Sequence, residues 1–61
     1  MKKYVIAYYG TSGNGLVDYN EDACISLDNA MTFDSEPEAF AYMVGLQNEW
    51  LSELRVEEVD L

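Results

Sequence analysis

Near the start of the chain the hydrophobic pattern has a period of two. Residues 3–9 are rich in Tyr, Val and Ile, which suit a pleated strand. Successive side chains of a strand point to opposite faces. One face carries Tyr4, Ile6 and Tyr8, and the other carries Val5, Ala7 and Tyr9. Because both faces are apolar, the pattern predicts a strand in the interior of a sheet.

A glycine-rich stretch follows this strand. Residues 10–15 include Asn14-Gly15, a strong turn signal because both residues tolerate positive φ. Residues 16–19 then form a short second strand that returns antiparallel. After a further turn, residues 23–27 form a third strand or a loop, and the pattern leaves these two alternatives open. Residues 31–33 are a short extended piece.

The clearest element is a helix from residue 36 to about residue 51. Asp34 or Ser35 is the N-cap, and Ser35 precedes Glu38 at the spacing of a capping box. Pro37 falls in the first turn, where its missing N–H costs nothing. The apolar stripe repeats at close to 3.6 residues and comprises Ala39, Phe40, Met43, Val44, Leu46, Gln47, Trp50 and Leu51. The opposite, wetter side carries Glu38, Tyr42, Gly45 and Glu49.

The last strand spans residues 54–59, and its alternation slips at Glu57-Glu58, which predicts a bulge or the strand's end. The element order is ββ(β)αβ, and the fold class is α+β. We expect a three- or four-stranded, mainly antiparallel sheet with one helix packed on one face. The last strand pairs with the first, the opposite sheet face has no covering layer, and residues 1–61 form one domain.

Charge narrows the range of partners. Twelve acids face three bases in 61 residues, for a net charge of −9. Such a field repels nucleic acid and anionic membranes and raises encounter rates with basic proteins. No apolar run approaches the length of a membrane span. With Cys24 as the only cysteine and hence no internal disulfide, we expect a reducing, cytoplasmic location.

The residue types also disfavour catalysis. There is no histidine, and one cysteine without a histidine partner matches neither a zinc site nor an activated nucleophile. The 10–15 loop lacks the Lys-Ser/Thr of a phosphate-binding loop. Asp18, Asn20 and Asp22 have the spacing of half a calcium loop, but Ala23 stands where that loop needs glycine. We therefore expect no enzyme, no cofactor and no metal.

Two surfaces are candidates for binding a protein partner. The first is an acidic set comprising Asp18, Glu21, Asp22, Asp28, Glu36, Glu38, Glu53, Glu57, Glu58 and Asp60. The second is the sheet face of Tyr4, Ile6 and Tyr8. We expect the smaller Val5 and Ala7 under the helix, because close packing favours small residues, which leaves the tyrosines as interface anchors.

The segment of residues 30–39, with Phe33-Asp34-Ser35 leading into an acidic helix start, resembles short uncharacterised proteins of phages and prophages. The amino-terminal Lys3-Tyr4-Val5-Ile6 of this chain is also similar to the start of those proteins. The strand-strand-helix-strand order and the acidity are also similar to the small inhibitors of host RNA polymerase from T7-type phages. The resemblance implies a mobile-element protein that inhibits a host factor.

Taken together, the sequence predicts a small acidic protein-binding module. Its partner is a basic, nucleic-acid-binding host protein that it occludes, and it binds neither nucleic acid nor membrane directly. The alternative is a self-associating structural domain, a homodimer built through the uncovered sheet face or the terminal strand.

Overall fold

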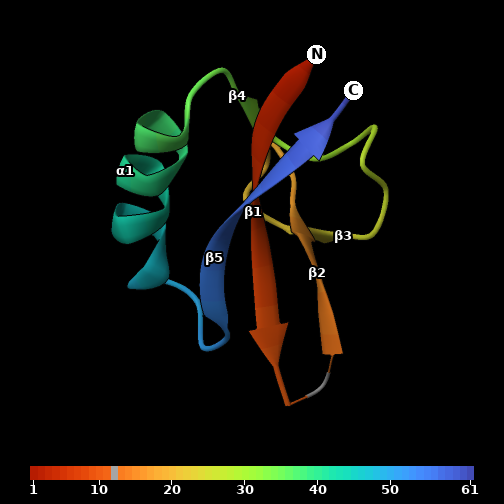
Figure 1. The fold of residues 1–61 in the computed structure, drawn as a ribbon. Coiled ribbons are helices and arrows are strands. Elements are labelled where there is room, and N and C mark those ends of the chain that lie inside the picture. The colour runs from red at the N-terminus through yellow and green to blue at the C-terminus, as the bar shows by residue number, and fades with distance from the viewer. Residues whose placement is uncertain (12) are drawn as a thin grey trace.

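The computed structural model describes residues 1–11 and 13–61; the predicted turn at 10–15 includes Ser12, which lies outside the described residues. The elements in chain order are β1 Lys2–Gly10, β2 Gly13–Val17, β3 Ala23–Cys24, β4 Thr32–Phe33, α1 Glu36–Gln47 and β5 Glu53–Asp60. The strands pair antiparallel, and α1 packs against one side of the sheet (Figure 1). The α+β prediction is confirmed, and two strands of two residues each bring the sheet to five strands.

Strand β1 lies at the centre of the sheet. One of its edges pairs with β5 over almost its whole length, from Lys2↔Asp60 to Tyr9↔Glu53. Its other edge pairs first with β4 and then with β2, and β3 adds to β2. The two termini therefore lie side by side, as Figure 1 shows. The predicted pairing of the last strand with the first is confirmed.

The first hairpin closes earlier than the turn signal predicts. Gly10 pairs with Gly13, so Asn14 and Gly15 already belong to β2 and do not form the turn. Gly13 supplies the positive φ, 134°, at the start of β2. Gly15 has a different role, since a Cβ there would lie 2.7 Å from the Tyr8 hydroxyl oxygen. It is glycine because the tyrosine ring crosses it.

The core lies between α1 and one face of the sheet. It is built from Ile6, Val17, Met31, Leu46 and Leu54. The register explains this choice of face, because Val56 lies opposite Ile6 and Leu54 lies opposite Tyr8, so large apolar side chains of two strands point the same way. The expectation that the Val5 and Ala7 face lies under the helix is wrong.

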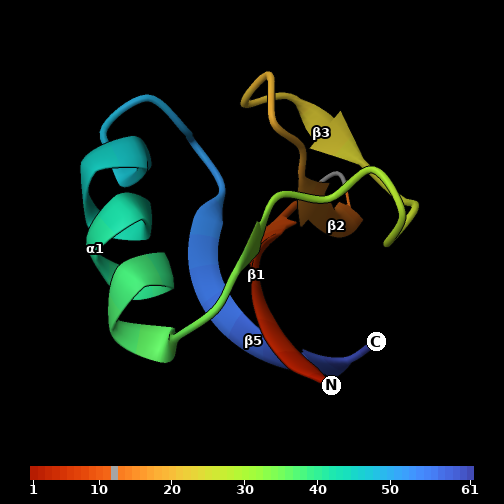
Figure 2. The same cartoon turned by 90° about the horizontal axis from the view of Figure 1, so that it is seen from above.

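Val5 and Ala7 are nevertheless buried, with 0% and 3% of their surface exposed. The sheet curls away from α1, as the view from above shows (Figure 2). Val5 and Ala7 alternate with Ile6, which packs in the core under α1, so they point to the other, inner face of the sheet. A strongly curled sheet has less room on its concave side, which suits small side chains there and large ones on the convex side. The prediction of an uncovered sheet face is thus wrong at the centre of the sheet.

Helix α1 begins as predicted and ends early. Ser35 is the N-cap, and its hydroxyl accepts a hydrogen bond from the Glu38 N–H. The predicted end near residue 51 is wrong, because after Gln47 the chain tightens into i→i+3 hydrogen bonds from Glu49 and Trp50. This turn places the Trp50 ring on Tyr8, with ring centroids 5.3 Å apart.

The remaining strands differ from the prediction in length. The second strand, expected at 16–19, is Gly13–Val17, and of residues 23–27 only Ala23–Cys24 form a strand. Strand β5 runs without a bulge or break at Glu57-Glu58, where both were expected as alternatives. Both glutamates have a polar partner: Glu57 accepts a hydrogen bond from the Tyr9 hydroxyl, and Glu58 forms an ion pair with Lys2.

Candidate functional site

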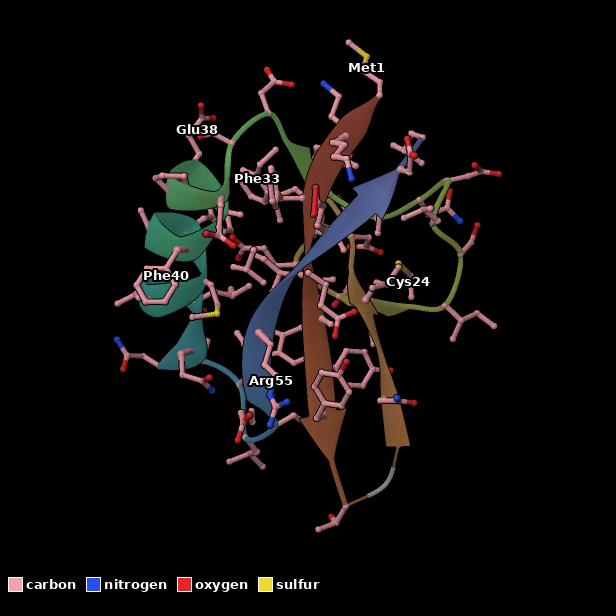
Figure 3. All side chains as sticks on the ribbon, in the orientation of Figure 1. Met1, Cys24, Phe33, Glu38, Phe40 and Arg55 are labelled. Atoms are coloured by element: carbon pink, nitrogen blue, oxygen red, sulfur yellow. The ribbon has the colours of Figure 1, made fainter. Side chains whose placement is uncertain are left out.

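The predicted aromatic face is not a free surface. Ile6 is fully buried, and Tyr8 is packed against the core. Tyr4 is half-buried and lies opposite Phe33, which Figure 3 shows between α1 and β1. The prediction that Tyr4, Ile6 and Tyr8 anchor a partner is wrong for Ile6 and Tyr8, because the helix already occupies that face.

A polar network occupies the sheet face away from α1. The Tyr9 hydroxyl donates to Glu57, and the Arg55 guanidinium lies 5.1 Å from the centroid of the Tyr9 ring. Arg55 also donates to Glu53. The hydrogen bond to Glu57 is the main reason that the pKa of Tyr9 is raised. The one arginine is thus engaged within the protein.

The cationic groups of the protein are all paired. The N-terminal amine binds Asp60, Lys2 binds Glu58, Lys3 binds Asp34 and Arg55 binds Glu53. Four of the twelve acids are used in this way. In the described part of the chain the other acids have no cation: Asp18, Glu21, Asp22, Asp28, Glu36, Glu38, Glu49 and Glu57.

The acidic residues nearest the N-terminus, Asp18, Glu21 and Asp22, lie in a hydrogen-bonded turn. Asp18 Oδ1 accepts hydrogen bonds from the N–H groups of Asn20 and Asp22, at 2.8 and 3.0 Å. Glu21 has a φ of 63° and accepts the hydroxyl of Tyr42 from α1. That hydrogen bond is the main cause of the raised pKa of Tyr42. In this turn the carboxylate of Asp18 holds the backbone of residues 20–22 through its two accepted hydrogen bonds.

Metal binding finds no support in this turn. Across residues 1–11 and 13–61, no three acidic or cysteine side chains come together in a group that could hold a metal ion.

Cys24 lies on β3, and its thiol donates to the Ser26 carbonyl at 3.6 Å. Burial raises its pKa, with a smaller contribution from the charge of Asp18. A thiol of this kind is a poor nucleophile at neutral pH.

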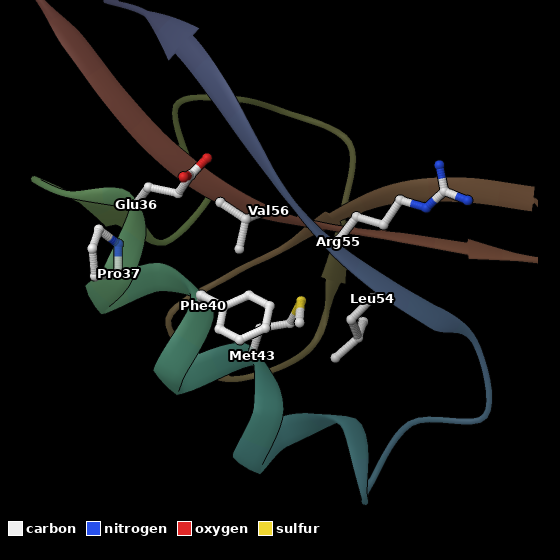
Figure 4. A pocket seen from close by; sticks show the side chains of 7 residues that line it. All are labelled: Glu36, Pro37, Phe40, Met43, Leu54, Arg55 and Val56. Carbon is white, nitrogen blue, oxygen red and sulfur yellow. The ribbon is translucent and has the colours of Figure 1, made fainter.

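A groove with a volume of about 600 Å³ lies between α1 and β5 (Figure 4). The helix contributes Glu36, Pro37, Phe40 and Met43, and the strand contributes Leu54, Arg55 and Val56. We call this the α1–β5 groove. Its floor is apolar, and Phe40 stands beside it with 55% of its surface exposed. Glu36 brings an unpaired carboxylate to it.

The α1–β5 groove was missed because Phe40 and Val44 were assigned to the buried stripe. They are 55% and 53% exposed, so that assignment is wrong. The buried residues of α1 are Ala39 and Leu46, which lie on one narrow line of the helix. A signal was present in the sequence, since apolar residues extend well beyond the roughly 100° stripe that core packing uses. These additional apolar residues leave Phe40 and Val44 exposed on α1.

The structure distributes the predicted acidic set over three places. Asp18, Glu21 and Asp22 lie in one turn, from which Glu21 joins Tyr42 and Glu49 beside α1. Glu36 lines the α1–β5 groove. The acids Glu53, Glu57, Glu58 and Asp60 belong to β5, the strand that forms the other wall of the groove, but they are not among its lining residues. Asp28 and Glu38 are exposed away from both, and Figure 3 shows Glu38 at the start of α1. The set is thus not one surface: Glu36 lines the α1–β5 groove, and Glu21 lines a smaller concavity of about 300 Å³ beside α1.

Comparison with known proteins adds no relative. No family model, curated protein or solved structure matches the chain. The resemblance of residues 30–39 to phage proteins stays a prediction. In the described residues, no helix is long and apolar enough to span a bilayer.

Proposed function

We propose that this protein is a small acidic protein-binding module that occludes a basic, nucleic-acid-binding host protein, as an inhibitor from a phage or mobile element does. The observation that carries the proposal is the position of the α1–β5 groove. An apolar groove with an exposed Phe40 lies beside a strand in which four of eight residues are acidic. An apolar centre within a charged rim is the usual anatomy of a protein interface.

Charge supports a basic partner. Every cation is already paired within the protein, which leaves eight side-chain carboxylates of the described residues without one. Their field accelerates encounter with a basic surface, and it repels nucleic acid. A protein bound through its nucleic-acid groove would then exchange phosphates for these carboxylates, which is the mechanism of occlusion.

The test is displacement of DNA. The tagged protein is used to capture proteins from a bacterial lysate at low salt, and each captured protein is purified. Its affinity for duplex DNA is then measured by fluorescence anisotropy with and without this protein. We expect the apparent Kd for DNA to rise with the concentration of this protein. Capture without any effect on DNA binding would contradict the proposed occlusion.

Two charge variants sharpen the test. The first combines Glu57→Gln, Glu58→Gln and Asp60→Asn on β5; the second combines Asp28→Asn, Glu38→Gln and Glu49→Gln away from it. Both remove three charges and keep the side-chain shapes. We expect the β5 variant to lower the association rate constant and its salt dependence more than the control. Equal effects would show that the charge acts only as a diffuse field.

A further inference from the structure

Strand β5 has one open edge. It pairs with β1 from Lys2↔Asp60 to Tyr9↔Glu53, and within the described residues no other strand pairs with it. An open edge presents backbone N–H and C=O groups that a further strand can bind. In β5 this edge runs beside the α1–β5 groove, to which Leu54, Arg55 and Val56 contribute.

The hydrogen bonds at the two ends of β5 show which backbone groups face outward. The Leu61 N–H donates to the Met1 carbonyl at 2.8 Å, so odd-numbered residues of β5 bond to β1. The Leu54 N–H instead donates to the side chain of Gln47 at 2.9 Å, away from β1. By this alternation the backbone groups of Val56, Glu58 and Asp60 point outward.

The outward-facing residues are also those whose side chains lie on the helix side of the sheet. Val56 lies opposite Ile6 and lines the groove with Phe40 and Pro37. A strand added antiparallel would place the residues that bond to β5 on the same face. Their side chains would enter the α1–β5 groove, and the alternate side chains would point to the other face.

Charge decides the occupant. A second copy of this chain would bring two strands together that each carry Glu53, Glu57, Glu58 and Asp60 against one arginine, and like charges opposite each other are destabilising. An extended segment with lysine or arginine at alternate positions suits the same edge. We infer that the open edge of β5 binds an extended basic segment of the partner as an added antiparallel strand, with its apolar residues in the α1–β5 groove. This inference rests on the proposed function.

A synthetic peptide tests this mode of binding. The probe is a blocked peptide of about eight residues in which Lys and Val alternate, matched in length to β5. It is titrated into the ¹⁵N-labelled full chain and followed by amide chemical shifts. We expect the largest shifts at Val56, Glu58 and Asp60. N-methylation of every Val should weaken binding at least about tenfold, because it removes the N–H groups that face β5. N-methylation of every Lys should leave binding nearly unchanged.

Two exposed apolar side chains form a matched pair of variants. Phe40→Ser removes the exposed wall of the groove, whereas Leu51→Ser changes a residue outside it that is fully exposed. We expect weaker peptide binding only with Phe40→Ser. Unchanged shifts of the core amides show that both variants fold.

Several outcomes would overturn the inference. These are shifts confined to residues 18–22, equal binding of the N-methyl-Val peptide, and failure of the peptide to bind. If DNA displacement is still observed in those cases, the proposed function stands and only the strand-addition mode falls. Concentration-dependent shifts of the β5 amides without peptide would instead assign this edge to a second copy.

Discussion

The side chain of Gln47, the last residue of α1, accepts the backbone N–H of Leu54 at a distance of 2.9 Å. The same amide donates to the carbonyl of Ser52 at 2.8 Å. Residues 48–52 are thereby held between helix and strand, and Leu54 enters the core with 4% of its surface exposed. One partly buried amide therefore joins α1 to β5 and fixes one end of the α1–β5 groove.

Replacing Gln47 should destabilise the fold. Gln47→Met keeps the approximate length of the side chain and leaves the Leu54 N–H without its partner. We expect a loss of about 1 to 3 kcal/mol in the free energy of unfolding, measured in urea. The control is Asn48→Ala at the neighbouring exposed amide, which should change stability by about 0.5 kcal/mol or less. Equal effects of the two variants would contradict this role of Gln47.

Two glycines should respond in opposite directions to alanine. At Gly15 a Cβ would lie 2.7 Å from the Tyr8 hydroxyl oxygen and 2.9 Å from the Cys24 carbonyl oxygen, so Gly15→Ala should cost about 1 to 3 kcal/mol. At Gly45 no described atom apart from the neighbouring residues and the adjacent helix backbone lies within 4 Å of the added carbon. Gly45→Ala should stabilise α1 by up to about 1 kcal/mol. A gain from Gly15→Ala would show that the Tyr8 ring does not cross β2 there.

Three tyrosines with hydrogen-bonded hydroxyls should have shifted titrations at alkaline pH. Hydrogen bonds to Glu57 and Glu21 raise the pKa of Tyr9 and Tyr42 above the ordinary value of 10.0. Hydrogen bonds with Thr32 lower the pKa of Tyr19. We expect Tyr9→Phe to remove a late phase from the absorbance of tyrosinate against pH, and Tyr19→Phe to remove an early one. The reverse assignment would contradict these contacts.

The same shifts give a sign for stability. In the folded state Tyr9 holds its proton more tightly than in the unfolded chain. Its contribution is therefore complete below about pH 10, the unfolded pKa. It is lost as the pH rises through the raised folded pKa. Between about pH 10 and the raised folded pKa, the stability of Tyr9→Phe should consequently fall less steeply with pH than the stability of the parent protein.

The start of α1 should depend on its cap. Ser35→Ala removes the oxygen that accepts the Glu38 N–H, and we expect a loss of about 1 kcal/mol in the free energy of unfolding. Ser35→Asp retains an acceptor at the positive end of the helix and should restore most of the loss. If Ser35→Asp is as unstable as Ser35→Ala, the cap is not the source of the effect.

Local signals in the sequence determined where most elements begin. The N-cap at Ser35 with Pro37 behind it predicts the helix start, because these residues act on the backbone beside them. The β-rich run of residues 3–9 predicts a central strand, since both of its faces are apolar. The net charge of −9 likewise belongs to the sequence alone, and so does the excess of apolar residues on α1.

Tertiary structure decided which face of each element is buried. Both faces of β1 are apolar: one carries Tyr4, Ile6 and Tyr8, and the other carries Val5 and Ala7. Only the register with β5 and the curl of the sheet assign the first of these faces to the helix. Residues far apart in the chain also set the end of α1, where Gln47 bonds to Leu54, and the exposure of Phe40 beside β5. The physical reason is that capping and strand propensity act over a few residues, whereas burial depends on which surfaces meet when the chain folds.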